Sequence, residues 1–276
     1  FDPSYNNSTN FFLSDGESND SGDLYPGTYS VAELTPNGWD LTSVVCSDGS
    51  APTSISISSG ETVTCVFTNT QRGHVVVEKD AIPDSSYEFT FNNNFGNNNI
   101  SVFGLTDDST TGLPSFDAEV LPGKYSVSED EAAGWKTDSI VCNNGETYDD
   151  IDVAAGETVT CTFTNEKLAS ITLVKNTVGG NGDFDFDATG TGLPTDIDLT
   201  TVAGTASQTF ENLDPDNTYT IAENVPGGWD LTSASCGNGD PIDDITPNAG
   251  EEITCTFTNS KLPTLTVTKV VINDNG

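Results

Sequence analysis

The sequence predicts an all-β chain in which antiparallel β-sandwich units follow one another in tandem and form a rod. Three observations predict this fold. Cysteines, tryptophans and short strand motifs recur about every 95 residues. Apolar and polar residues alternate at period two between clusters of Gly, Pro, Asn and Asp, which is typical of strands and turns. No helical periodicity of useful length appears.

Composition narrows the class of protein. The chain has 276 residues, with 43 acidic and 8 basic side chains and a formal net charge of -35. Such a charge excludes a nucleic-acid binder that works by neutralising phosphates, and it disfavours an anionic membrane surface. No stretch approaches the roughly 18 apolar residues of a spanning helix, so we expect no membrane insertion within this chain. A single histidine, His74, leaves little material for an enzyme with acid–base chemistry.

Several sequence features recur together at the same spacing and define the repeat. Gly-Trp occurs three times, and so does a Tyr-x-Val/Ile-x-Glu motif. The cysteines form three pairs whose members are 19 positions apart: Cys46 and Cys65, Cys142 and Cys161, and Cys236 and Cys255. The even count and regular spacing predict a disulfide within each unit, and hence an oxidising, extracellular setting. Metal ligation is the weaker alternative, because there is no C-x-x-C motif and no histidine nearby.

The spacing also predicts domain boundaries. Residues 74–167 and 168–262 are expected to form complete β-sandwiches, each opening with an alternating strand. Residues 1–73 are expected to form an incomplete sandwich that lacks its first strand. Residues 263–276 carry the pattern of an orphan first strand. The joins between units are only a few residues long, which favours a stiff rod over beads on a flexible string.

Each unit points three polar side chains at its apolar face. Residues i, i+2 and i+4 of a strand share a face, and on this count a Lys, a Glu and an Asn point inward with the core residues. The lysines are Lys79, Lys175 and Lys269. The glutamates are Glu33, Glu129 and Glu223. The asparagines are Asn69, Asn165 and Asn259.

These three residue types can form a covalent cross-link. Burial disfavours the charged forms of Lys and Glu, so a neutral amine becomes accessible as a nucleophile. That amine can attack the Asn carboxamide carbon and expel ammonia, while a protonated Glu hydrogen-bonds the amide oxygen, polarises it and shuttles protons. The predicted product is an isopeptide bond between the first and last strands, made once and without turnover. The alternative is a buried Lys–Glu–Asn hydrogen-bond network with no covalent bond.

The order of these motifs in each unit resembles that of a known family. A Lys in the first strand, Y-x-V-x-E followed by G-W, and F-x-N in the last strand are similar to collagen-adhesin B-type domains, the SpaA-type repeats of Gram-positive surface pilins and adhesins. Tyr29–Trp39 and Tyr219–Trp229 match best, whereas the middle unit lacks the usual Pro before Gly134. The resemblance implies an immunoglobulin-like, prealbumin-like sandwich and the same Lys–Asn isopeptide with Glu assisting. Two departures are the regular disulfides and the absence of an LPxTG sorting signal.

Weaker patterns suggest ligands and modification. Acidic stretches at Asp15–Asp23, at Asp183, Asp185 and Asp187, and at Asn273–Gly276 are candidates for Ca²⁺, although a solvated acidic surface is the favoured interpretation. No other cofactor or metal is expected. Glycosylation motifs begin at Asn6, Asn7, Asn19 and Asn99.

The leading hypothesis for function is a structural subunit of an extracellular filament or pilus-like surface rod. Its expected partners are other copies of itself, arranged head to tail. Lys269 of one copy would enter the N-terminal unit of the next and bond Asn69 there, assisted by Glu33. Alternatively, residues 263–276 begin a further repeat of a longer chain. The rival functions are a tandem-repeat adhesin, and a stalk that presents a ligand-binding or catalytic domain.

Overall fold

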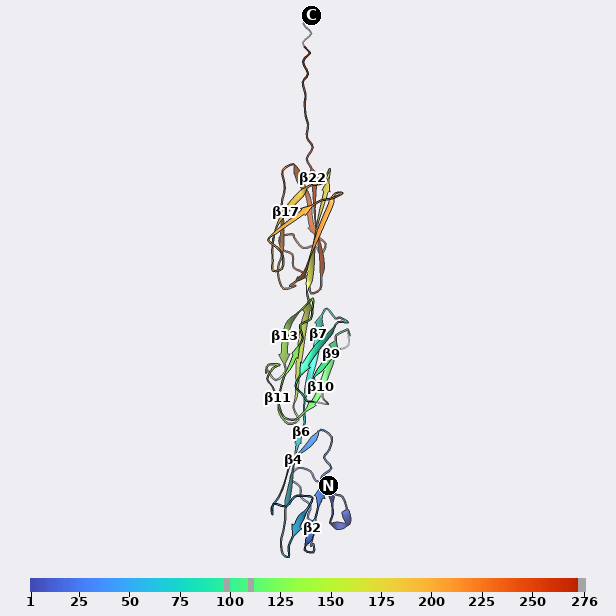
Figure 1. The fold of residues 1–276 in the computed structure, drawn as a ribbon, viewed down its shortest axis with the longest axis vertical. Helices are drawn as coiled ribbons and strands as arrows, with labels where there is room; N and C mark the ends of the chain where they lie inside the picture. The colour runs from blue at the N-terminus through green and yellow to red at the C-terminus, as the bar shows by residue number, and fades with distance from the viewer. Residues whose placement is uncertain (97–99, 109–111, 273–276) are drawn as a thin grey trace.

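The computed structural model describes residues 1–96, 100–108 and 112–272. Three β-sandwich units lie one after another along a single long axis, and residues 263–272 extend beyond the last of them (Figure 1). We call these the N-terminal unit (β1–β6), the middle unit (β7–β15), the third unit (β16–β22) and the C-terminal segment (residues 263–272). Among the described residues, no helix is long and apolar enough to cross a membrane.

The middle unit is a complete sandwich. Its strands are β7 (Gly73–Ile82), β8 (Glu88–Asn93), β9 (Val102–Thr106), β10 (Ser115–Val120), β11 (Gly123–Tyr125), β12 (Val127–Glu129), β13 (Trp135–Cys142), β14 (Ile151–Val153) and β15 (Thr158–Lys167). One sheet has the order β10-β7-β15-β13 and faces the sheet β12-β8-β9, while β11 pairs with β14. Strand β7 begins at Gly73, one residue before the expected start of the unit.

The third unit repeats this arrangement. Its strands are β16 (Ala169–Val178), β17 (Asp183–Thr189), β18 (Asp196–Thr200), β19 (Thr205–Leu213), β20 (Thr220–Asn224), β21 (Trp229–Cys236) and β22 (Glu252–Lys261). The sheet orders are β19-β16-β22-β21 and β18-β17-β20. In both complete units the first and last strands pair in parallel, β7 with β15 and β16 with β22, whereas the other strand pairs are antiparallel as expected. They are parallel because the chain enters each unit at the start of the first strand and leaves it, at the opposite end, at the end of the last strand.

The N-terminal unit lacks a counterpart of β7 and β16. Its strands are β1 (Asp2–Pro3), β2 (Gly27–Tyr29), β3 (Val31–Ala32), β4 (Trp39–Cys46), β5 (Ile55–Ile57) and β6 (Cys65–Gln71). They pair as β1-β3, β2-β5 and β4-β6, so within the described part of the chain no strand lies on the second edge of β6. The stretch 19–24, which corresponds to β10, is also without strand structure. In a complete unit this stretch would pair with the first strand, which lies between it and the last strand. In the N-terminal unit, both neighbours of the missing first strand are therefore unpaired on that side.

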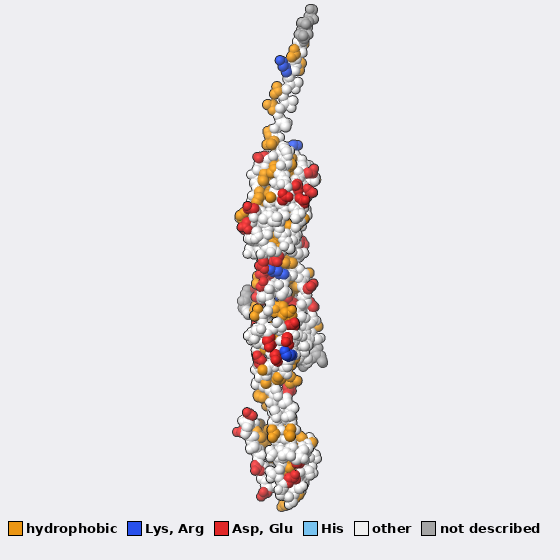
Figure 2. Space-filling model, turned by 90° about the vertical axis from the view of Figure 1, so that its left-hand side faces the viewer, with side chains coloured by type: hydrophobic (Ala, Val, Ile, Leu, Met, Phe, Trp, Pro, Cys, Tyr) orange, Lys and Arg blue, Asp and Glu red, His pale blue; other side chains and the backbone are white. Residues whose placement is uncertain are grey.

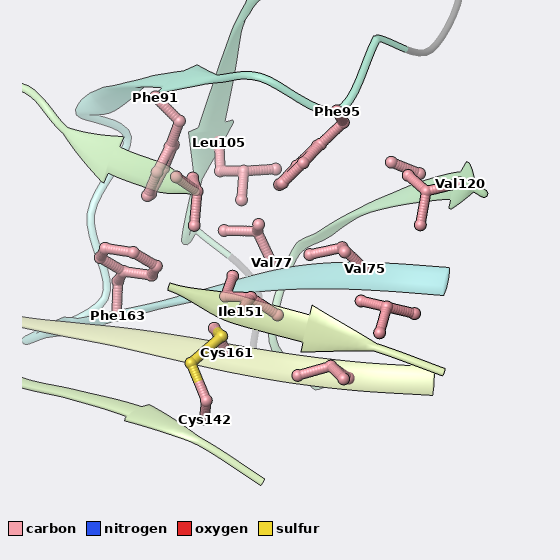
Figure 3. Packing of buried hydrophobic residues seen from close by; sticks show 14 of the residues in the cluster. Val75, Val77, Phe91, Phe95, Leu105, Val120, Cys142, Ile151, Cys161 and Phe163 are labelled. Atoms are coloured by element: carbon pink, nitrogen blue, oxygen red, sulfur yellow. A yellow bond between two sulfur atoms is a disulfide. The ribbon is translucent and has the colours of Figure 1, made fainter. Parts of the chain in front are cut away.

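Alternation along the strands builds the cores. In β7, residues Val75 and Val77 are fully buried, while Val76 between them is partly exposed. They pack against Ile151 and Phe163, beside the Cys142–Cys161 disulfide (Figure 3). Burying an aliphatic or aromatic side chain of this size contributes roughly 1.5–3 kcal/mol. The N-terminal unit has a much smaller buried cluster, centred on Val31, Cys46 and Ile55.

The recurring Gly-Trp dipeptides form a backbone hydrogen bond at the end of each unit. In each case the Gly carbonyl accepts a hydrogen bond from the backbone N–H that follows the last strand. The three bonds are Arg72 to Gly38 at 2.8 Å, Leu168 to Gly134 at 2.9 Å and Leu262 to Gly228 at 2.8 Å. The dipeptide therefore fixes the direction in which the chain leaves each unit.

The three expected disulfides are present, each within its own unit: Cys46–Cys65, Cys142–Cys161 and Cys236–Cys255. The two cysteines of each pair lie directly opposite each other on neighbouring antiparallel strands, as Cys142 and Cys161 do on β13 and β15. Each bond closes a chain segment between strands that already pair, and it restricts the unfolded chain.

Replacing Cys142 and Cys161 together with Ala should lower the unfolding free energy of the middle unit by about 3 kcal/mol, because the unfolded segment regains its freedom. Calorimetry should show this as an earlier transition for one unit, with the transition of the third unit unchanged as an internal control. Peptide mapping without reductant should recover three intra-unit pairs from the wild type. Pairs between different units would contradict this assignment.

Candidate functional site

A buried lysine in the third unit meets a glutamate and an asparagine. Lys175 follows Ile171 and Leu173 on the inward face of β16, and its side chain is fully buried. Its Nζ donates a hydrogen bond to Glu223 Oε2 at 2.8 Å and another to Asn259 Oδ1. Asn259 Nδ2 in turn donates to Glu223 Oε1 at 2.5 Å. The three side chains therefore form a closed triangle of hydrogen bonds.

Strand register explains why these side chains meet. In the parallel pair of β16 and β22, Lys175 lies opposite Phe257, and Asn259 is the next inward residue after it. The long lysine side chain covers this two-residue offset. Glu223 lies on β20 in the facing sheet, where it is paired with Phe186. The triad therefore ties the first and last strands together and also spans the two sheets.

The triad of the middle unit has the same residues in a looser arrangement. Lys79 Nζ donates to Asn165 Oδ1 at 3.1 Å and to the backbone carbonyls of Phe163 and Asp80 at 3.0 and 2.8 Å. Glu129 Oε1 lies 3.7 Å from Nζ and has no hydrogen-bond partner, although only 4% of that side chain is exposed. The amine here is shared between the asparagine and two carbonyls, and the glutamate stands slightly apart.

Burial changes the proton affinities of both triads. It lowers the pKa of Lys79 and of Lys175, because the apolar surroundings disfavour an ammonium, while the neighbouring glutamate works in the opposite direction. Burial likewise raises the pKa of Glu129, against the effect of Lys79. Phenylalanine rings contribute to these surroundings, with Phe89 centred 4.2 Å from the Lys79 amine and Phe184 4.4 Å from the Lys175 amine. Both shifts favour the neutral forms.

The N-terminal unit brings together only two of its three residues. Asn69 Nδ2 donates to Glu33 Oε1 at 2.6 Å, as in the third unit. Asn69 Oδ1 and Glu33 Oε2 are buried and have no hydrogen-bond partner. These are the two kinds of oxygen that receive the lysine in the third unit. Lys269 lies in the C-terminal segment, where it is exposed, so the structure does not place it at this site.

The glutamate contacts a different atom of the asparagine from the one expected. The sequence argument placed a protonated Glu on the amide oxygen. In the N-terminal and third units the carboxylate instead accepts a hydrogen bond from the amide nitrogen, and in the complete units the amide oxygen receives the lysine. Each of these glutamate contacts pairs the NH₂ donor of the amide with an acceptor oxygen of the glutamate.

The weaker expectations gain no further support from the structure. Asp183, Asp185 and Asp187 lie along β17, where Asn224 donates hydrogen bonds to the last two. The stretch Asp15–Asp23 lies on the surface. Asn7 and Asn19 are exposed, and Asn6 begins the short 3-10 helix η1 (Asn6–Ser8). Asn99 and Asn273–Gly276 lie outside the described residues.

One charged cluster was missed by sequence reasoning. Asp138, Glu166 and Asp216 lie within reach of one another where the middle and third units meet. Lys136 contacts Glu166 and Asp216, and its Nζ lies 2.8 Å from Asp214 of the third unit. The Lys136 ammonium therefore offsets part of the negative charge of this cluster. Its members are far apart in sequence, and no spacing pattern signals them.

Comparisons with known proteins agree with this repeat. The family model of the SpaA-type prealbumin-like fold domain matches three stretches, residues 6–71, 75–167 and 171–261. No curated protein matches the sequence.

Solved structures with weak similarity include a Bacillus anthracis protein and two streptococcal pilins. The Bacillus anthracis TIE protein shares 16% identity at a TM-score of 0.29, and the match covers 85% of this chain and 54% of the length of that protein. The major pilin T-13 of Streptococcus pyogenes shares 14% identity at a TM-score of 0.25, covering 70% of this chain and 98% of the pilin. A streptococcal ancillary pilin shares 16% identity at a TM-score of 0.27, and the match covers 87% of this chain and 77% of that pilin.

The family match includes most of the chain and both complete triads. Its three stretches coincide with the three disulfide-bonded units and stop before the C-terminal segment. The chain therefore belongs to the family of SpaA-type prealbumin-like fold domains.

Proposed function

We propose that this chain is a structural subunit of an extracellular filament or surface rod, stabilised by Lys–Asn isopeptide bonds. The observation that carries the proposal is the buried amine in each complete unit, which hydrogen-bonds the asparagine of the last strand. A disulfide in every unit is typical of an oxidising, extracellular compartment. Acidic side chains are spread over all three units (Figure 2), which favours solubility.

The proposed reaction joins the lysine amine to the asparagine side chain. The neutral Nζ attacks Cγ, the Nζ–Cγ bond forms, the Cγ–Nδ2 bond breaks, and ammonia leaves. No oxidant, metal or second substrate is required. The glutamate is close to both nitrogens in the third unit, so it can accept a proton from Nζ and deliver one to the departing Nδ2. The lowered pKa of each lysine increases the fraction of the nucleophilic form.

The middle unit offers a route for the leaving group. A surface pocket of about 410 Å³ is lined by Trp135, Thr137 and Asn165, together with residues 131–133. Because Asn165 is itself a wall of this pocket, ammonia released from its side chain has a short path to solvent. Loss of ammonia to solvent makes the cross-link effectively irreversible.

Intact mass of the wild-type subunit should be lower by one ammonia for each complete unit. Glu129→Ala should remove the loss in the middle unit only, and Glu223→Ala the loss in the third unit only, since each triad has its own glutamate. Tryptic mapping should find Lys79 joined to Asn165, and Lys175 joined to Asn259.

The matched control for Glu129→Ala is Glu88→Ala, which changes an exposed glutamate on β8 of the same sheet. This variant should keep the full mass loss. A wild-type subunit of unreduced mass would contradict the covalent reaction and leave only the hydrogen-bonded triads.

Assembly is proposed to use the open edge of the N-terminal unit. The C-terminal segment repeats the first-strand pattern, with Leu265, Val267 and Lys269 at the positions of Ile171, Leu173 and Lys175. Leu265 and Val267 are 90% and 85% exposed in this chain, so they lack the burial that their counterparts have. By the register of the complete units, Lys269 would lie opposite Phe67 of β6 and reach Asn69.

The segment cannot fill this edge in its own chain. The C-terminal segment and the N-terminal unit lie at opposite ends of the rod, with two whole units between them (Figure 1). We propose that the segment enters the N-terminal unit of a second copy as a parallel neighbour of β6. Lys269 would then meet the two oxygens of Glu33 and Asn69 that have no partner. A contact between opposite ends does not close on itself, so it generates a filament.

Boiling assembled protein in detergent and reductant should leave a ladder of multimers, because Lys269–Asn69 bonds resist both treatments. Lys269→Ala should collapse the ladder to single subunits. The control Lys124→Ala removes an exposed lysine that pairs only with Asp150, and it should leave the ladder intact. Wild-type protein that runs only as single subunits would contradict covalent assembly between copies and would favour a segment that begins a further repeat.

A further inference from the structure

One turn has the same conformation in all three units. It precedes the last strand and covers residues 58–61, 154–157 and 248–251. In each turn the final glutamate accepts a hydrogen bond from the backbone N–H of the first residue, at 2.8, 2.8 and 2.9 Å. The third residue is a glycine with positive φ, at 78°, 74° and 70° for Gly60, Gly156 and Gly250. The N-terminal unit therefore presents this turn already formed, despite its incomplete sandwich.

At both joints, where one unit meets the next, this glycine contacts the last residue of the final strand of the preceding unit. A Cβ atom added to Gly156 would lie 2.6 Å from Gln71 Oε1, and one added to Gly250 would lie 3.1 Å from Lys167 Cδ. Gly250 also donates a backbone hydrogen bond to the Lys167 carbonyl at 2.7 Å. Gln71 and Lys167 are the last residues of β6 and β15. The glycine turn is therefore a contact surface for the end of the last strand of the unit before it.

At the two ends of this chain, a glycine turn and the end of a last strand remain that take part in no such contact with the described residues. An added Cβ on Gly60 would meet nothing within 4 Å. Lys261, the counterpart of Gln71 and Lys167, ends β22 and is exposed. Strand β6 runs from near the Gly60 turn toward the middle unit, so the turn lies at the outer end of the rod. Strand β22, which ends at Lys261, lies in the third unit, where the C-terminal segment leaves the sandwich (Figure 1).

Each joint also carries a cation between acids of both units. Arg72 contacts Asp40 of the N-terminal unit at 2.6 Å and Glu119 of the middle unit at 3.4 Å. Lys136 contacts Glu166 of the middle unit and Asp214 of the third unit. In Figure 2 a basic patch flanked by acidic atoms marks this second joint. In a chain of net charge -35, such a cation offsets the repulsion between acids of the two units.

We propose that Lys261 of one copy seats on the Gly60 turn of a second copy and forms a third joint of the same kind. Lys261 supplies the cation, and the acids are Asp230 of its own unit and Asp23 of the second copy. Asp230 is the counterpart of Asp40, and Asp23 is the counterpart of Glu119. This inference rests on the proposed head-to-tail assembly and adds a second contact to it. The inserted strand supplies cohesion, while the joint fixes how successive copies are oriented.

Cysteine cross-linking tests the joint separately from the isopeptide. The variant carries Asn69→Ala, which removes the electrophilic carbon and leaves Glu33 to pair with Lys269. Gly60→Cys and Lys261→Cys are added to it, so that the new disulfide takes the place of the Lys261 ion pairs. The inserted strand with Lys269 holds the copies together while the protein is oxidised mildly at filament-forming concentration. The intramolecular control is Gly250→Cys with Lys167→Cys, because a Cβ on Gly250 would lie 3.4 Å from the Lys167 Cβ, close to the usual spacing in a disulfide.

We expect a ladder of disulfide-linked multimers that extends beyond the dimer and collapses on reduction. Either new cysteine alone can give at most a dimer. The control variant should form its bond within single subunits, which shows that the turn tolerates a cysteine. Multimers in light scattering without the ladder would overturn the joint and leave strand insertion standing. Single subunits throughout, at every concentration, would overturn both.

Discussion

The two complete units must each keep a lysine amine inside an apolar sandwich. An isolated ammonium there costs several kcal/mol even after the protein relaxes, so the lysine must have partners on every side. Asn259 supplies an oxygen from the neighbouring strand and Glu223 a carboxylate from the facing sheet. This requirement fixes the register between β16 and β22 and the distance between the sheets. Once the three groups are held together, they are also positioned to react with one another.

The N-terminal unit shows the arrangement without the first strand and its lysine. The glutamate–asparagine hydrogen bond persists, but two buried oxygens lack partners and the β10-like stretch forms no strand. An unmet buried acceptor costs free energy comparable to a lost hydrogen bond. The open edge is thus selective as well as unstable, because an inserted strand must bring an amine at one position. Few strands of an acidic chain meet that requirement.

Sequence alone predicts much of this architecture because strand chemistry is periodic. The period-two pattern identifies the inward lysines, and equal spacing identifies which cysteines pair, so Lys79 and Cys142–Cys161 follow from counting residues. The parallel pairing of β7 with β15 does not follow, because alternation is the same for either direction. The difference between the triads of Lys79 and Lys175 also escapes, since it depends on which carbonyls lie nearby. The joint ions depend on contacts between units that no local pattern encodes.

The parallel direction of the first and last strands has a mechanical consequence. Tension along the rod enters the middle unit at the start of β7 and leaves at the end of β15, so it slides these neighbouring strands past each other in shear. Every hydrogen bond between them then resists together, instead of opening one after another from an end. Lys79 and Asn165 lie near the ends of their strands that face the third unit. A bond between them would pass tension from β7 directly to β15, and most of the sandwich, including its disulfide, would carry none.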